Sequence, residues 1–361
     1  MLSDKDIETV LKLSTIKNLN ESTLREIVLK FKPLSTVFDT SLGGFNKLGD
    51  EKFISAIKKA KTISVETQTA LLKRFNINIL TTEDVEYPMN LKELPDAPPM
   101  LYIQGNILDT DTQAIAIIGS RTPTHYGKLV TETFVKEFIL SGITIVSGLA
   151  RGIDTYAHRE TLAAKGRTIA VIGSGIDKIY PPENHELFNK ISESGAVISE
   201  FPLGTQPWAG NFPARNRIIS GLSKAIVVME ASLQSGVFST VEWAIKQGKD
   251  VFAVPGNITS ENSKGTNKLI KDGAIPVTSA KDVLEYLGIL QIAPVPNKKI
   301  IELTEEENTL FTILTYEPIH LDQLAILLKL PVQTVLSLLL NLELKGIVRQ
   351  LPGRHFAKNK Y

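Results

Sequence analysis

The feature that most constrains this chain is a regular alternation of short apolar runs and helical patterns between about residue 115 and residue 277. The apolar runs are rich in β-branched residues and predict strands, while the segments between them have helical periodicity. Strands that alternate with such helices form βαβ units and a mostly parallel sheet. We therefore expect an extended Rossmann-like α/β core over residues 81–288. The expected strands are 115–118, 143–146, 168–172, 196–199, 225–229, 250–253 and 275–277, and the expected helices are 128–140, 154–164, 184–192, 216–221, 240–247 and 264–271.

The two flanks of this core have other patterns. Residues 1–80 are mostly helical in period and predict a small all-α domain, SAM-like or helix–hairpin–helix-like. Helix–hairpin–helix DNA contacts rely on hairpin glycines, which the first loop at residues 17–22 lacks, so a structural or docking role is favoured. Residues 289–302 are proline-containing and predict a linker. Residues 303–361 combine three helical patterns with a short hairpin, which is the outline of a winged helix.

Composition limits the kinds of partner. Lys and Arg number 40 against 39 Asp and Glu, so any nucleic-acid site must be a local cluster and not a basic domain. The chain has no Cys, which excludes disulfides and thiolate metal sites and fits a reducing compartment. The start has no signal-peptide pattern, and no apolar run approaches the ~20 residues that span a bilayer. We expect a soluble cytoplasmic protein with no membrane partner.

Two strand–turn–helix units carry polar groups where a parallel sheet binds ligands, beyond the carboxyl ends of its strands. Gly119, Ser120 and Arg121 follow the strand at 115–118, and a guanidinium there can grip a phosphate with two parallel hydrogen bonds. An ordinary turn with a solvated arginine is the competing interpretation. Gly148 and Arg151 follow the strand at 143–146 and precede a helix whose free amides can face an anion.

Asp154 and His158 stand four residues apart on that same predicted helix. They could be acid–base partners or two metal ligands, but an N-cap or packing role for Asp154 is favoured. The spacing shows no third ligand, so we predict no metal site.

Further along, Arg215 and Arg217 flank Asn216 at the point where a helix is expected to begin. Two cations at a helix N-terminus oppose the helix dipole, which favours an anion held between them over a solvated surface pair. Ser235 and Gly236 precede another helix and offer either a phosphate cradle or an ordinary helix start.

Two nucleotide-binding loops are excluded. Gly173 and Gly175 follow a strand, but Lys178 stands where the dinucleotide fingerprint needs its third glycine. The chain also has no Gly-x-x-x-x-Gly-Lys-[Ser/Thr] sequence, so it is not a P-loop ATPase. We expect no cofactor.

Several motifs, in this order along the chain, resemble those of the DNA-processing protein DprA (Smf) family. The resemblance is dense over about residues 87–288 and extends to the plan of a helical domain, a Rossmann core and a winged helix. The motifs are Gly119-Ser120-Arg121, Ser147-Gly148-Leu149-Ala150-Arg151-Gly152-Ile153-Asp154, Tyr180-Pro181-Pro182-Glu183-Asn184, Ser199-Glu200-Phe201-Pro202, Phe212-Pro213-Ala214-Arg215-Asn216-Arg217-Ile218-Ile219-Ser220-Gly221-Leu222-Ser223 and Val251-Phe252-Ala253-Val254-Pro255-Gly256.

This resemblance implies a non-enzymatic bacterial protein that binds and protects single-stranded DNA during natural transformation. It implies that the protein recruits and loads the recombinase RecA and forms a homodimer through its core. The strand-binding residues that it implies are Gly119, Ser120, Arg121, Gly148, Arg151, Arg215, Asn216, Arg217, Ser235 and Gly236. Phe212, Tyr126 and Phe238 are aromatic residues nearby on which bases could stack.

The chain departs from the family in two places. Phe238 enlarges the loop after Ser235, where it could stack on a base or simply fill space. The expected recognition helix at 332–344 carries no Lys or Arg before Lys345, whereas groove-reading helices usually bring cations to phosphates and bases. Protein contact is therefore favoured over duplex readout for the winged helix.

A nucleotide-processing enzyme is the rival hypothesis. Nucleotide N-glycosidases similar to lysine decarboxylases also use a Rossmann core with a glycine-rich turn followed by Thr and Glu. Gly236, Thr240 and Glu242 fall loosely in that order, and Glu242 or Glu230 could be the general acid. The Pro-Gly-Gly-x-Gly-Thr loop of those enzymes is absent, which favours the DNA-binding hypothesis.

Overall fold

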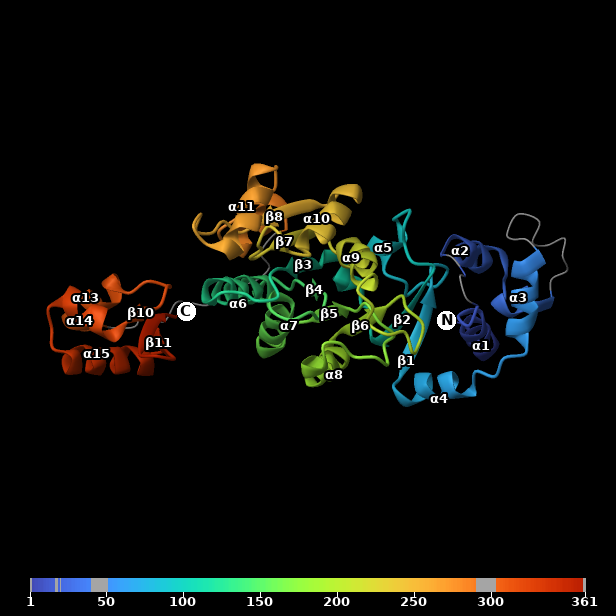
Figure 1. Ribbon diagram of the computed structural model, residues 1–361, viewed down its shortest axis with the longest axis horizontal. Helices are drawn as coiled ribbons and strands as arrows, with labels where there is room; N and C mark the ends of the chain where they lie inside the picture. Colours follow the sequence, from blue (N-terminus) through green and yellow to red (C-terminus); the bar gives the residue numbers. More distant parts are fainter. Residues whose placement is uncertain (1, 17–18, 20, 40–50, 290–302, 360–361) are drawn as a thin grey trace.

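The computed structural model describes residues 2–16, 19, 21–39, 51–289 and 303–359, and Figure 1 shows them as an elongated molecule. A large sheet with helices on both faces occupies the middle. The N-terminal helices lie at one end and the C-terminal helices at the other (Figure 1). The predicted fold class, an extended α/β core between an all-α domain and a winged helix, is confirmed.

The central sheet has nine strands in the order β1-β2-β6-β5-β4-β3-β7-β8-β9. From β6 to β9 all neighbouring strands are parallel, whereas β2 runs antiparallel to β1 and β6. The chain winds outward from β3 in both directions, so the order reverses between β3 and β7, the switch point at which such sheets bind ligands. The strands are β1 (Ile77–Thr81), β2 (Met100–Gly105), β3 (Ile115–Ile118), β4 (Ile145–Ser147), β5 (Thr168–Val171), β6 (Ala196–Ser199), β7 (Ala225–Val228), β8 (Asp250–Ala253) and β9 (Ile275–Pro276).

Alternation along the strands divides the core between the two faces of the sheet. Ala116 and Ile118 of β3 pack into the cluster under α5, α9, α10 and α11, while Ile115 and Ile117 pack under α6, α7 and α12. These helices are α5 (Met89–Lys92), α6 (His125–Leu140), α7 (Ile153–Ala163), α8 (His185–Ser194), α9 (Asn211–Leu222), α10 (Val237–Lys246), α11 (Lys264–Lys271) and α12 (Ala280–Tyr286), with 3-10 turns η3 (Asp109–Gln113), η4 (Pro182–Asn184) and η5 (Glu261–Ser263).

Helix α9 begins at Asn211, five residues before the predicted start at Asn216. Pro213 therefore lies inside the first turn of the helix and not ahead of it. A proline is tolerated there because the first amides of a helix have no intrahelical partner. As a result, Arg215 and Arg217 lie in the body of the helix, and the expectation that they stand at its N-terminus is wrong.

The N-terminal helices pack against the outer strands of the sheet. Ile77, Ile79 and Tyr102 of these strands belong to the same buried cluster as Val10 and Leu13 of α1. The elements are α1 (Asp4–Leu13), α2 (Glu21–Lys30), η1 (Leu34–Asp39), α3 (Glu51–Lys61) and α4 (Glu66–Arg74).

The C-terminal elements form a winged helix with its own core and a three-stranded sheet, one short strand more than the predicted hairpin. It lies beside α6 in Figure 1, and Arg349 Nη2 is 2.7 Å from His125 Nε2 at the start of that helix. No single helix in the described ranges is long and apolar enough to cross a membrane. The elements are α13 (Glu305–Ile313), β10 (Ile319–His320), α14 (Leu321–Leu328), α15 (Val332–Leu344), β11 (Val348–Leu351) and β12 (His355–Lys358).

Candidate nucleic-acid interface

A small cleft lies beyond the carboxyl ends of β3, β4 and β5. Three of the predicted site residues, Arg121, Gly148 and Arg151, line it together. We call this site the aromatic cleft. Its lining residues are Arg121, Gly148, Ala150, Arg151, Gly173, Ser174, Tyr180 and Phe212.

Two neighbouring aromatic rings with an arginine at each end form a row across the aromatic cleft. The Arg121 guanidinium lies 5.9 Å from the centroid of the Phe212 ring, and that of Arg151 lies 6.0 Å from the centroid of the Tyr180 ring. The two ring centroids are 5.8 Å apart, with 47° between the ring planes. Both arginines are exposed, and Tyr180 is 38% exposed. The row thus presents cations for phosphates and ring faces for bases.

One acidic residue contacts this row. Glu183 accepts a hydrogen bond of 2.5 Å from Arg151 Nε, and the side chains remain 51% and 55% exposed, respectively. The hydrogen bond that Arg151 donates to Glu183 raises the pKa of the Arg151 guanidinium. Because an exposed ion pair of this kind is weak, a phosphate can compete for the arginine.

The glycines of the strand ends make room for the protein's own atoms. A Cβ at Gly119 would lie 2.6 Å from Ile153 Cγ1, and one at Gly148 would lie 2.6 Å from Arg215 Nη1. The protein's own packing therefore requires a glycine at each of these two positions.

Arg215 forms the floor beneath the aromatic cleft. It is 4% exposed, and its Nη1 donates to the carbonyl oxygens of Gly148, at 2.6 Å, and Val171. Asp154 Oδ2 accepts from the Gly148 amide at 3.2 Å and the Ala150 amide at 3.4 Å. Burial raises the pKa of Asp154 to about 6, against the opposing effect of the Arg215 cation. Together the two side chains hold the loop after β4.

His158 has a different partner from Asp154. Its Nδ1 lies 2.7 Å from Thr168 Oγ1, and burial lowers its pKa to about 3, so the ring is neutral at physiological pH. No group of three His, Asp or Glu side chains in the described ranges is placed to hold a metal ion. Asp154 and His158 thus bond to different neighbours and not to each other, and the hydrogen bonds of Asp154 are of the packing kind that we favoured for it.

Arg217 points away from the aromatic cleft and joins the core to the N-terminal helices. It is 6% exposed and forms ion pairs with Glu200 and, at 3.1 Å, with Glu21 of α2. It also donates to the carbonyl oxygen of Asp96 at 2.5 Å. Since Arg215 and Arg217 donate to separate internal acceptors, the structure does not support an anion held between them.

Ser120 and Glu230 fill the switch point between β3 and β7. The Ser120 amide donates to the Glu230 carbonyl at 2.7 Å, and its hydroxyl accepts from the Thr122 amide at 3.1 Å. The Glu230 carboxylate accepts from the amide of Thr124 at 2.8 Å and from its hydroxyl at 2.6 Å. A carboxylate thus occupies the start of α6, where a Rossmann fold usually holds a nucleotide phosphate. This placement disfavours Glu230 as the general acid of the rival hypothesis.

The remaining predicted residues lie outside the aromatic cleft. Ser235 Oγ accepts from the Val237 amide at 3.3 Å, as at an ordinary helix start, and Gly236 is exposed with open space around its Cα. Asn216 is half-buried on α9. The lining residues that the sequence motifs did not predict as strand-binding are Ala150, Gly173, Ser174, Tyr180 and Phe212. The Gly-x-Gly after a strand is a signal for Gly173, and Phe212 is predicted from sequence only as a residue on which a base could stack.

Comparison with known proteins identifies one family. A family model described as DNA recombination-mediator protein A matches residues 78–288, and one described as the DprA winged helix domain matches residues 294–354. "Protein Smf" of Synechocystis is 34% identical over 96% of this chain and 97% of its own length.

Two solved structures are similar in fold and sequence. DprA of Streptococcus pneumoniae superposes with a TM-score of 0.67 and 35% identity, covering 79% of this chain and 98% of its own. DprA of Helicobacter pylori, solved to describe its single-stranded DNA binding mode, has a TM-score of 0.53 and 33% identity, covering 59% and 96%. Because the core model spans more than half of the chain and a relative matches along almost its whole length, the chain belongs to the family of DNA recombination-mediator protein A, whose members are named DprA or Smf.

Proposed function

We propose that this protein binds single-stranded DNA in the aromatic cleft as a recombination mediator, without catalysing a reaction. The observation that carries the proposal is the row Arg121–Phe212–Tyr180–Arg151, in which two adjacent aromatic rings lie between two exposed cations. Unpaired bases can stack on such rings whatever their identity, whereas paired bases in a duplex cannot reach them.

In this proposal some of the predicted site residues contact the strand and others support the surface that it contacts. Arg121 and Arg151 bind phosphates, while Gly119, Ser120 and Gly148 shape the strand ends that carry them. The strand continues past Asn216 toward Ser235 and Gly236, where open space surrounds the exposed glycine. Arg215 and Arg217 act from within, because their donors are bound to internal acceptors. Binding is then largely independent of sequence and sensitive to salt.

Family membership supports the rest of the proposed role. We infer that the protein acts in the cytoplasm during natural transformation, protects incoming strands and loads RecA, and works as a homodimer.

Fluorescence anisotropy with labelled single strands of increasing length tests the proposal, with duplex DNA and a mononucleotide as competitors over a series of salt concentrations. We expect preference for long single strands, and we expect Arg121→Ala to weaken binding about tenfold for every sequence and to reduce the salt slope by about 0.7. Arg74→Ala is the matched control, since Arg74 is also exposed and lies 5.2 Å from the centroid of the Phe75 ring on the N-terminal domain. Equal losses in both variants, or tight binding of the mononucleotide, would contradict the proposal.

A further inference from the structure

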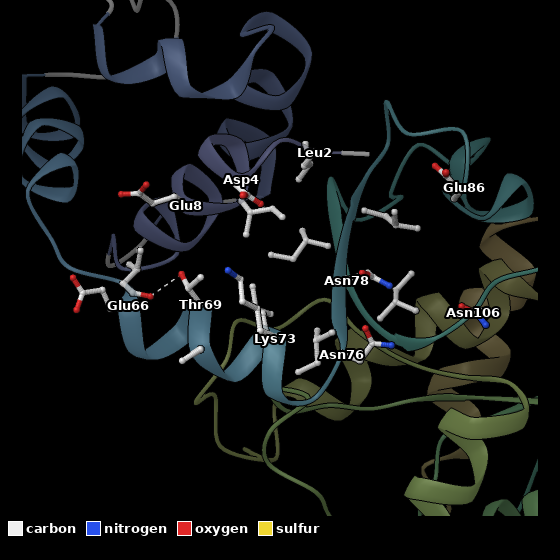
Figure 2. Close-up of a pocket in the computed structure, with 18 of the residues that line it drawn as sticks. Leu2, Asp4, Glu8, Glu66, Thr69, Lys73, Asn76, Asn78, Glu86 and Asn106 are labelled. Atoms are coloured by element: carbon white, nitrogen blue, oxygen red, sulfur yellow. Dashed lines mark hydrogen bonds between the residues drawn. The ribbon is translucent and has the colours of Figure 1, made fainter.

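A second, larger cavity lies at the opposite end of the sheet from the winged helix. It is a groove of about 920 Å³ between helices α1 and α4 on one side and strand β1 on the other (Figure 2). We call it the edge groove. None of its lining residues belongs to the aromatic cleft.

Strand β1 lines the edge groove, and its outer edge has no partner strand. At Thr81 both backbone groups turn away from β2, because its amide donates to Asp84 Oδ2 and its carbonyl accepts from the Asp84 amide. Backbone groups alternate in direction along an antiparallel strand, so those of Ile79 and Ile77 point the same way. Strand β1 ends the sheet, and no partner within the described residues binds the outward groups of Ile79. An unpaired edge of this kind is a template for a further strand.

The walls of the edge groove are largely apolar. Side chains from the helices and from the outer strands line it, so it can accept the apolar side chains of a chain laid along β1. These apolar residues are Leu2, Ile7, Val65, Ala70, Leu72, Ile77, Ile79, Leu80, Ile103 and Ile107.

Acidic residues dominate the rim of the edge groove. Asp4, Glu8, Glu66 and Glu86 lie around it with Lys73 as the single cation among the lining residues (Figure 2). Glu8 is paired with Lys12 at 2.7 Å, whereas no ion pair within the described ranges holds Asp4, Glu66 or Glu86. The excess negative charge repels nucleic acid and attracts cationic side chains.

We propose that the edge groove binds an extended peptide segment of a partner protein, in which apolar side chains alternate with Lys or Arg. The segment adds to β1 as a tenth strand of the sheet, its backbone bonding to Ile77 and Ile79. Its apolar side chains enter the groove, and its cations meet the carboxylates of the rim. This inference does not depend on the proposed binding of DNA.

The first experiment measures binding of a fluorescein-labelled peptide of alternating Val and Lys to the full-length protein. We expect Glu66→Lys/Glu86→Lys to weaken binding about tenfold, because two attractive contacts with the cations of the peptide become repulsive. The control is Glu26→Lys/Glu193→Lys, which makes the same change of charge at exposed positions away from the groove. Absence of binding to the natural sequence, or equal losses in both double variants, would overturn the proposal.

The second experiment separates strand addition from simple charge attraction. A peptide of the same sequence with alternate backbone amides N-methylated cannot form hydrogen bonds to β1, so we expect it to bind at least tenfold more weakly. With the unmodified peptide we expect slower hydrogen exchange at the Ile79 amide. Equal binding of the two peptides would overturn strand addition. If the natural protein self-associates and Glu66→Lys/Glu86→Lys abolishes this, a second copy of the chain covers the groove. That result would also overturn the proposal. Single-stranded DNA binding should be unchanged in all these variants.

Discussion

Two pairs of arginines in this protein have opposite surroundings. Arg121 and Arg151 are exposed at the ends of strands, beside the rings of Phe212 and Tyr180. Arg215 and Arg217 on α9 are 4% and 6% exposed. In the sequence, all four stand in motifs that predict a cation able to bind an anion.

The difference between the pairs lies in what their donors already bind. Arg215 donates to backbone carbonyls, and Arg217 to a carbonyl and two carboxylates. To bind these donors, a phosphate would have to break buried hydrogen bonds. This costs more free energy than displacing water from an exposed arginine. The comparison therefore separates residues that contact a strand from residues that hold the contact surface, and each prediction below tests that separation.

The largest effect is expected for Arg215→Ala. The change removes the hydrogen bonds that Arg215 donates to the Gly148 and Val171 carbonyls. It also removes the cation near the buried Asp154 carboxylate. We therefore expect the free energy of unfolding to fall by about 3–5 kcal/mol. Urea denaturation measures it, with Arg159→Ala as an exposed control on α7 that should change stability by less than about 0.5 kcal/mol. A variant of unchanged stability that binds DNA weakly would place Arg215 among the contact residues instead.

Arg217→Ala should destabilise somewhat less, by about 3 kcal/mol, since Glu21 is 44% exposed and can be rehydrated. Urea denaturation again reports the loss. Single-strand affinity measured on the folded variant should stay within about twofold of the natural protein. A tenfold loss of affinity without a loss of stability would break the comparison, because Arg217 would then behave like Arg121.

Phe212→Leu should weaken binding of single strands by about 1–3 kcal/mol, the usual contribution of one stacked base. Leucine keeps the apolar volume but removes the ring that lies between Arg121 and Tyr180. Anisotropy titrations with homopolymeric strands measure the loss, which we expect to be similar for each. Phe212→Tyr is the control and should keep most of the affinity; a loss as large as that of leucine would argue against stacking.

The buried acid that pairs with Arg217 predicts a dependence of stability on pH. Burial raises the pKa of Glu200 from its ordinary 4.5 to about 7, against the opposing effect of the Arg217 cation. Because the folded protein holds this proton more tightly than the unfolded chain, the contribution of Glu200 is fully present below about pH 4.5 and is lost as pH rises to about 7.

Comparison with Glu200→Gln isolates this contribution from that of His158, whose lowered pKa acts in the opposite direction. Urea denaturation at several pH values should show the natural protein losing stability relative to the variant between about pH 4.5 and 7, with a constant difference above. A difference that does not change across this window would show that Glu200 is not a buried, proton-binding partner of Arg217.

Arg349→Ala should have the smallest effect. Arg349 is half-buried and contacts His125 Nε2 at 2.7 Å, where burial and then the Arg349 cation lower the pKa of His125. Removing the cation should raise the pKa of His125, which NMR titration of the imidazole measures, and leave single-strand affinity within about twofold. A larger loss of affinity would mean that the winged helix contributes to the strand-binding surface.

Much of the fold follows from local pattern. The alternation of Ile115 and Ile117 with Ala116 and Ile118 is that of a strand buried on both faces, which is how β3 packs. Sequence reasoning missed the true start of α9, because a proline reads as a helix boundary although the first turn accepts it. It also missed the two-residue strand β10, which is too short to have a pattern and exists only because it pairs with β12.

The candidate site was predictable in a similar, partial way. Arg121, Gly148 and Arg151 follow strands that end at the same edge, so their meeting could be inferred from strand order in a parallel sheet. Tyr180 lies in a loop of no regular period, and no local pattern shows that its ring meets Phe212.

The sequence by itself determined which residues form strands and helices, that the sheet is mostly parallel, and which loops carry cations to its edge. Only the tertiary structure decided which of those cations are exposed and which are buried. Arg215 binds a carbonyl 67 residues away in the sequence, and Arg217 binds a carboxylate 196 residues away. Periodicity depends on near neighbours along the chain, whereas the burial of a guanidinium and the occupation of its donors depend on segments that meet only when the chain folds.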